Sequence, residues 1–100
     1  MGCKIIFSPQ AIADLEEVVR HIANDDPATA IRIGSALIDR VEILENFPLL
    51  GAPYPKRPSV RKLVSRPYII FYRFREQDNF VDILRYWHGA QQEPDLRPLD

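Results

Sequence analysis

The chain has 100 residues, of which 46% are hydrophobic and 27% are charged, and its formal net charge at pH 7 is −1. This composition excludes a disordered chain, and the length suits a single domain. The single cysteine, Cys3, excludes an internal disulfide and favours a reducing, cytoplasmic location. We expect no membrane-spanning segment, because no apolar run approaches the ~18 residues that one needs.

Two helices are predicted in the first half of the chain. Residues 3–7 are β-branched and aromatic enough to predict a short strand before them. Ser8 followed by Pro9 is a helix start signal, and an apolar stripe at intervals of three and four residues continues to about residue 24. Asp26 and Pro27 repeat the signal for a second helix. Gly34 inside it predicts the close approach of another backbone. The second stripe consists of Ala30, Ile33, Leu37, Val41 and Leu44.

The second half predicts an antiparallel meander. Residues 60–64, 68–75 and 80–88 are apolar runs separated by short turn segments. The element order is therefore β-α-α-β-β-β. It predicts an α+β two-layer domain in which two N-terminal helices pack on a mainly antiparallel four-stranded sheet. We expect residues 1–92 to form this domain and residues 93–100 to be a loose acidic tail.

The charged residues are distributed unevenly along the chain. Residues 1–45 carry four Lys or Arg against eight acids, and residues 76–100 carry two against six. Residues 46–75 contain no acid at all. This segregation predicts a cationic docking face for a negatively charged or amphipathic partner. Its members are Lys56, Arg57, Arg61, Lys62, Arg66, Arg73 and Arg75.

Five short motifs follow one another between residues 4 and 91. They are the sequence DLE at 14–16, Phe47-Pro48-x-x-Gly51, Arg61-x-Leu63, Tyr68-x-Ile70-x-Tyr72 and Trp87-His88-Gly89. In this order and spacing the chain resembles the RelE/ParE superfamily of bacterial toxins, the plasmid stabilisation family, which belong to type II toxin–antitoxin modules. The segments at 47–51 and 60–73 look closer to the ParE-like branch.

The resemblance implies a small growth-inhibiting toxin that a cognate antitoxin neutralises by laying a segment across its surface. Operator DNA would be contacted only through the antitoxin. The branches of the superfamily differ in their targets. RelE-like members cleave mRNA on the ribosome, whereas ParE-like members poison DNA gyrase and need no nuclease active site.

Candidate residues for RNA cleavage are present. Cleavage without a metal requires a base for the 2′-hydroxyl, a cation for the phosphate and an acid for the leaving oxygen. Arg61 and Arg85 would hold phosphate oxygens, His88 would move protons, and Tyr86 is a further candidate. On a regular strand Tyr86 and His88 share a face that Arg85 does not, so joining them would require a bend. The alternative is that Arg61 is a solvated residue and His88 a structural one.

Several features weaken the nuclease interpretation. Many relatives carry an arginine where this chain has Gln91, and RNA-cleaving members tend to place a basic residue where it has Ile69 and Ile70. We expect no metal site and no cofactor, because His21 and His88 are the only histidines and no phosphate-binding loop or catalytic-serine motif occurs. Three hypotheses remain open: a gyrase inhibitor, a ribosome-dependent endoribonuclease, and a non-toxic member that only binds the antitoxin. Whether the chain is an enzyme stays open with them.

Overall fold

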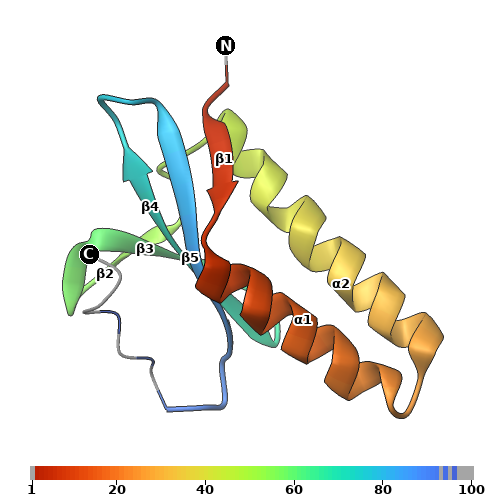
Figure 1. Cartoon of the computed structure of the whole chain (residues 1–100). Helices are drawn as coiled ribbons and strands as arrows, with labels where there is room; N and C mark the ends of the chain where they lie inside the picture. Colours follow the sequence, from red (N-terminus) through yellow and green to blue (C-terminus); the bar gives the residue numbers. More distant parts are fainter. Residues whose placement is uncertain (1, 93, 95, 97–100) are drawn as a thin grey trace.

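Two helices cover one face of a five-stranded sheet in the computed structural model, which describes residues 2–92, 94 and 96 (Figure 1). The two-layer α+β architecture predicted from the sequence is confirmed. The elements are β1 (Lys4–Phe7), α1 (Pro9–Ala23), α2 (Pro27–Glu42), the 3-10 helix η1 (Ile43–Glu45), β2 (Ala52–Tyr54), β3 (Arg57–Ser65), β4 (Tyr68–Arg75) and β5 (Phe80–His88).

The sheet has one strand more than the sequence predicted. Its order is β1-β5-β4-β3-β2, in which β1 pairs with β5 in parallel and the other neighbours are antiparallel. The additional strand, β2, has three residues and includes Pro53. Because it is short and lies at the edge of the sheet, it lacks the alternating apolar pattern by which a longer strand is found.

Both helices begin at the residues that the sequence indicated. The hydroxyl of Ser8 accepts a hydrogen bond from the N–H of Ala11 at 3.0 Å. The carboxylate of Asp26 accepts one from the N–H of Thr29 at 3.2 Å. Each cap satisfies a backbone donor that the first helical turn leaves without a partner. The two helices then run side by side as an antiparallel pair (Figure 1).

The contact between the helices explains Gly34. A Cβ atom at this position would lie 2.9 Å from Cγ2 of Val19, closer than the two carbons can approach. The neighbour is therefore a side chain of α1 rather than a second backbone, which corrects the expectation from the sequence. Val19 is β-branched and stiff at χ1, so it cannot readily move away from an added methyl group.

The main core lies between the helices and the sheet. Four alternate residues of β4 face the helices, as the alternation predicted: Tyr68, Ile70, Tyr72 and Phe74. Leu37 and Val41 of α2 meet this face and are almost completely buried. The hydrophobic effect of this burial is the main force that fixes the two layers together.

A second, smaller core lies on the opposite face of the sheet. Its buried members are Tyr54, Val60, Phe71, Leu84 and Leu96, with Ile69 and Trp87 packed against them. Leu96 is only 4% exposed, and Pro94 is also buried. Both belong to the predicted loose tail at 93–100, whose other residues lie outside the described part. The second face is therefore partly covered by apolar side chains, besides the cations that the sequence placed on it.

Candidate functional site

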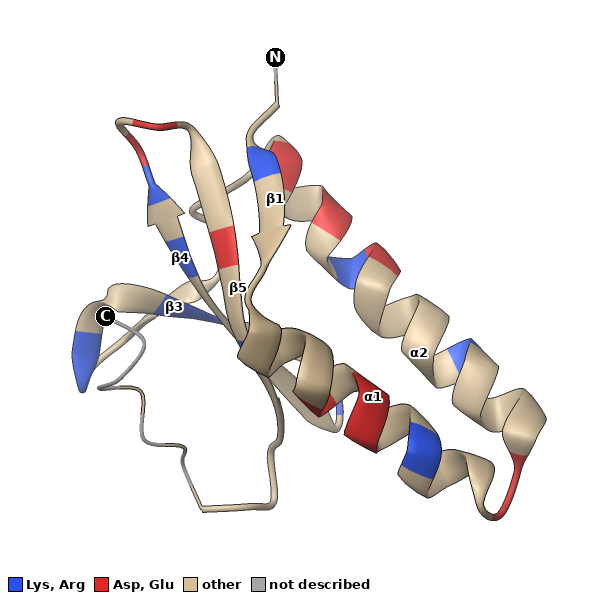
Figure 2. Ribbon diagram, in the orientation of Figure 1, with Lys and Arg blue, Asp and Glu red and all other residues tan. Residues whose placement is uncertain are grey.

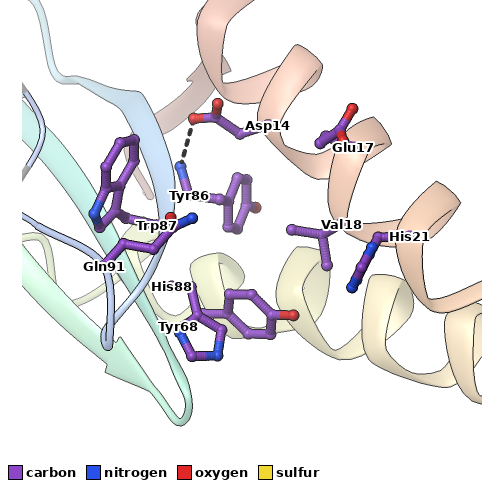
Figure 3. Close-up of a pocket in the computed structure, with 9 residues that line it drawn as sticks. All are labelled: Asp14, Glu17, Val18, His21, Tyr68, Tyr86, Trp87, His88 and Gln91. Atoms are coloured by element: carbon purple, nitrogen blue, oxygen red, sulfur yellow. Dashed lines mark hydrogen bonds between the residues drawn. The ribbon is translucent and has the colours of Figure 1, made fainter.

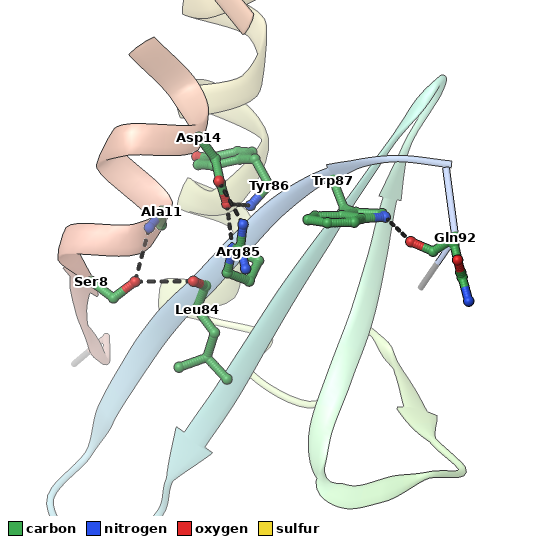
Figure 4. A network of polar contacts seen from close by, with 8 residues as sticks. All are labelled: Ser8, Ala11, Asp14, Leu84, Arg85, Tyr86, Trp87 and Gln92. Carbon is green, nitrogen blue, oxygen red and sulfur yellow. Dashed lines mark hydrogen bonds and ion pairs between the residues drawn. The ribbon is translucent and has the colours of Figure 1, made fainter. Parts of the chain in front are cut away.

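Arg85 is held by a carboxylate of the first helix (Figure 4). Its Nε lies 2.6 Å from Oδ2 of Asp14, and its Nη2 lies 2.8 Å from Oδ1 of the same residue. The N–H of Tyr86 donates to this carboxylate as well, at 3.1 Å. The hydrogen bond that Arg85 donates to Asp14 raises the pKa of Arg85 above its usual value. A bidentate pair between arginine and carboxylate of this kind is strong, and it fixes the orientation of the guanidinium group.

A bulge in β5 produces this arrangement. Phe71 pairs with Arg85 while the next residue of β4, Tyr72, pairs with Ile83, so Leu84 has no opposite residue. The extra residue shifts the alternation of β5 by one position. Beyond the bulge Arg85 is placed where its guanidinium stacks over the Trp87 ring, 5.0 Å from the ring centroid. The hydroxyl of Ser8 donates to the carbonyl of Leu84 at 3.0 Å, which ties the start of α1 to the bulge.

Arg61 is engaged elsewhere in the molecule. Its Nη1 donates to the carbonyl oxygens of Leu49, at 3.2 Å, and Gly51, at 2.7 Å. Its guanidinium therefore holds the chain segment between η1 and β2. The hydroxyl of Tyr72 holds the same segment, because it donates to the Pro48 carbonyl and accepts the N–H of Gly51, both at 2.8 Å. Desolvation raises the pKa of this phenol.

Tyr86 and His88 share the face of β5 that points toward the helices, as the alternation predicted. The hydroxyl of Tyr86 donates to the carbonyl of Leu37 at 3.0 Å, and burial raises its pKa far above the ordinary range. Nδ1 of His88 accepts the N–H of Ala90 at 3.1 Å. The His88 ring also meets Tyr68 edge to face, with 5.5 Å between ring centroids.

The four candidates for RNA cleavage do not form one constellation in the structure. Arg61 lies opposite Tyr72, whereas His88 lies at the level of Tyr68 and Ser65. Four residues of β3 separate these levels, or about 13 Å along a strand. Arg85 lies on the other face from Tyr86 and His88. General acid–base chemistry requires the acting groups within hydrogen-bond reach of a common substrate.

A cleft of about 340 Å³ lies between α1 and the end of β5 (Figure 3). It brings Tyr86 and His88 together with three residues of α1 that were not predicted, Asp14, Glu17 and His21. Their spacing of three and four residues places them on one helix face, and this was the signal that could have revealed them. Its remaining lining residues are Val18, Tyr68, Trp87 and Gln91.

The chemistry of this cleft does not suit a polyanion. Among the described residues that line it there is no Lys or Arg, whereas Asp14 and Glu17 contribute carboxylates. The described lining therefore offers a phosphate no guanidinium or ammonium group, and its two carboxylates are already paired with Arg85 and Arg20. Gln91 lies at this site and supplies an amide where a cation would be needed. Stabilising a pentavalent phosphate requires preorganised donors or cations instead.

The residues of the predicted cationic face are only partly available. Asp82 lies opposite Arg73 on the neighbouring strand, and its Oδ2 is 3.3 Å from Nη2 of Arg73 and 2.8 Å from Nε of Arg75. The ammonium of Lys62 lies over the ring of Tyr54, 5.6 Å from its centroid. The acid-free stretch in the sequence is therefore neutralised in part by a strand that follows it. Lys56 and Arg66 are exposed, and Arg57 is half-buried.

The described residues meet the requirements of neither a metal site nor a membrane-spanning helix. Within 2–92, 94 and 96, no group of three or more His, Cys, Asp or Glu side chains is placed to hold a metal ion. Over the same residues, no helix has both the length and the apolar character needed to cross a membrane.

The chain matches the family described as ParE toxin of type II toxin–antitoxin system, parDE, over residues 5–93. This chain belongs to the ParE toxin family. Y4kP of Sinorhizobium fredii (strain NBRC 101917 / NGR234), which is named as a toxin candidate, is 34% identical over 95 residues that cover 93% of this chain and 95% of Y4kP. The RelE/ParE resemblance seen in the sequence is thereby confirmed, and the chain is a toxin of a type II toxin–antitoxin system.

Two solved structures are similar in fold to this ParE toxin. The chromosomal ParDE toxin–antitoxin system from P. aeruginosa contains a chain with a TM-score of 0.73 and 24% identity, covering 86% of this chain and 95% of that one. The RelBE2 toxin–antitoxin complex from Mycobacterium tuberculosis contains one with a TM-score of 0.70 and 23% identity, covering 88% and 99%. At these identities the likeness concerns the fold.

Proposed function

We propose that this ParE toxin acts by binding DNA gyrase and that a cognate antitoxin neutralises it. The observation that carries the proposal is the pair formed by Asp14 and Arg85. It commits the arginine nearest the acid–base candidates to a structural role on α1. An inhibitor that acts by binding needs a defined surface but no assembled acid, base and phosphate cradle.

The gyrase target rests on the family. ParE-like members poison gyrase, as the resemblance implies, and the chain belongs to the ParE toxin family. The antitoxin rests on the same membership, and both solved structures are described as toxin–antitoxin systems or complexes. In the toxin–antitoxin complex, we expect only the antitoxin to contact operator DNA.

Cleavage of mRNA on the ribosome is the alternative that this proposal displaces. It would need Arg61 or Arg85 to release their present partners and reach His88. It would also need a phosphate to bind in a cleft whose described lining contains no Lys or Arg. A third alternative, antitoxin binding without toxicity, predicts that induction of the chain leaves growth unchanged.

Induction of the toxin alone in bacterial cells separates these alternatives. We expect growth arrest with gyrase-linked DNA breaks and with intact mRNA when RNA 5′ ends are mapped, and co-expression of the antitoxin should restore growth. Cuts at fixed codon positions, abolished by His88→Ala, would show instead that the chain is a ribosome-dependent nuclease. Normal growth with soluble, folded toxin would leave only the antitoxin-binding role.

A further inference from the structure

The chain between η1 and β2 forms a tight turn made of unusual residues. The N–H of Leu50 donates to the carbonyl of Phe47 at 3.1 Å, which closes a four-residue turn with Pro48 at its second position. Turns are normally built from small or polar residues. Here Phe47 is 61% exposed, Leu49 is 59% exposed and Leu50 is 49% exposed. None of these three side chains belongs to either hydrophobic core of the described chain.

Side chains of β3 and β4 hold the backbone of the turn in place. Tyr72 binds both the Pro48 carbonyl and the Gly51 N–H, and Arg61 donates to the carbonyls of Leu49 and Gly51. A Cβ atom at Gly51 would lie 2.7 Å from the carbonyl oxygen of Lys62, so the backbone sits directly against β3. A segment fixed in this way loses little entropy when a partner covers it.

Exposed apolar side chains concentrate at this turn. Eight large hydrophobic side chains are exposed in the described part of the chain, and four of them belong to the segment 43–50. We call these four residues the turn patch: Ile43, Phe47, Leu49 and Leu50. Exposed apolar groups scattered singly are ordinary, whereas a concentration of them marks an interaction site.

Three exposed carboxylates flank the turn patch on the side of α2 and η1. Asp39, Glu42 and Glu45 are exposed at the end of α2 and in η1, where Figure 2 shows acidic residues gathered. Two cations lie near them, and each donates to a backbone carbonyl: Nε of Arg40 to Val64 at 3.1 Å, and Nη1 of Arg61 to Leu49 at 3.2 Å. No Lys or Arg occurs between residues 41 and 55. A partner that covers the patch therefore gains from basic residues at its edge.

We propose that the turn patch is a docking surface for the antitoxin, and that the antitoxin segment bound there is apolar with basic flanks. The inference rests on the proposed neutralisation by a cognate antitoxin and specifies where and by what chemistry it acts. Of the acidic or amphipathic partners that the charge distribution in the sequence suggested, it keeps the amphipathic one. The reason is spatial, because Arg61, Arg73 and Arg75 are already bound within the toxin.

The test measures the dissociation constant of purified toxin for the antitoxin encoded beside it, by titration calorimetry at two salt concentrations. The double variant Phe47→Ser/Leu49→Ser should bind about tenfold more weakly or worse, because central apolar anchors carry most of an interface. Glu42→Lys/Glu45→Lys should also weaken binding, and it should reduce the dependence of affinity on salt.

Matched controls lie elsewhere on the helices. Among the described residues Ile31 is the most exposed large apolar side chain, at 70%, and it lies at the opposite end of α2, so Ile31→Ser should bind like the wild type. Glu16→Lys reverses an exposed acid on α1 and should likewise leave affinity unchanged. All the substituted side chains are exposed, and circular dichroism should show that each variant stays folded.

The remaining outcomes decide against the inference. Equal affinity of the turn-patch variants and the wild type would exclude this surface as the antitoxin site. If affinity is unchanged but light scattering shows that Phe47→Ser/Leu49→Ser breaks up a toxin dimer, the patch joins two copies of the chain. If the variant loses gyrase inhibition while its affinity for the antitoxin is unchanged, the turn patch binds gyrase instead. Failure of the wild-type toxin to bind any neighbouring antitoxin would refute the proposed partner itself.

Discussion

Asp14 and Arg85 join the first helix to the last strand through two hydrogen bonds, of 2.6 and 2.8 Å, between one carboxylate and one guanidinium. Their side chains are only 16% and 18% exposed. The same carboxylate accepts the N–H of Tyr86 at the free edge of β5. The pair therefore ties α1 to β5 just beyond the residues of β5 that pair with β1.

Removing this carboxylate should destabilise the fold. In Asp14→Ala the guanidinium of Arg85 and the N–H of Tyr86 both lose their partner, and we expect the free energy of unfolding to fall by about 2–3 kcal/mol. Chemical denaturation monitored by circular dichroism measures the change. Glu17→Ala is the control, because its pair with Arg20 is largely exposed and should contribute less than about 0.5 kcal/mol. Equal effects of the two variants would contradict this role for Asp14.

The hydroxyl of Tyr72 should stabilise the turn between η1 and β2. Tyr72→Phe keeps the buried ring but leaves the Pro48 carbonyl and the Gly51 N–H without their partner, so we expect a loss of about 1–3 kcal/mol in unfolding free energy. Hydrogen exchange at Gly51 should become faster while exchange in α1 stays protected. Unchanged exchange at Gly51 would mean that Arg61 alone holds the turn.

The toxin should lose stability in alkaline solution. Burial raises the pKa of Tyr86 and Tyr72 above the ordinary value of 10.0. These phenols stay protonated in the folded chain while those of the unfolded chain ionise, so their contribution is complete below pH 10 and is lost as pH rises through the folded pKa values. Urea unfolding at about pH 8, 10 and 11 should show the decline, and Tyr86→Phe should make it shallower. A flat profile would contradict the burial of these hydroxyls.

Asp82 should limit the positive charge on the second face of the sheet. Asp82→Asn removes the carboxylate shared by Arg73 and Arg75, and the two guanidinium groups then repel each other. We expect a loss of about 1–3 kcal/mol that is partly recovered as salt is added. Denaturation in low and high salt measures this effect. A loss that does not depend on salt would point to packing rather than charge.

Local sequence signals were sufficient to predict the helices and the three main strands. Ser8, Pro9, Asp26 and Pro27 act within one helical turn, so their effect does not depend on distant residues. The alternation in β4 was equally local, because it requires only one buried face. The short strand β2 was missed because its pairing with β3 is a tertiary contact that leaves no periodic pattern in three residues.

The candidate site was less predictable because its decisive contacts join residues far apart in the chain. Asp14 and Arg85 are separated by 71 positions, and nothing near either residue indicates the other. The acid-free stretch appeared cationic because Asp82, which pairs with Arg73, follows it in sequence but lies beside it in space. The bulge at Leu84 also shifts which face of the sheet the following residues of β5 point to, and regular alternation does not anticipate this.

The most direct test of the account is a DNA supercoiling assay with purified gyrase, wild-type toxin and the variant His88→Ala. Inhibition by binding predicts that both proteins block supercoiling to a similar degree, since it requires no proton transfer from His88, whose ring contacts Tyr68. If folded wild-type toxin leaves gyrase fully active while it cleaves ribosome-bound mRNA, and His88→Ala abolishes that cleavage, the central claim is wrong.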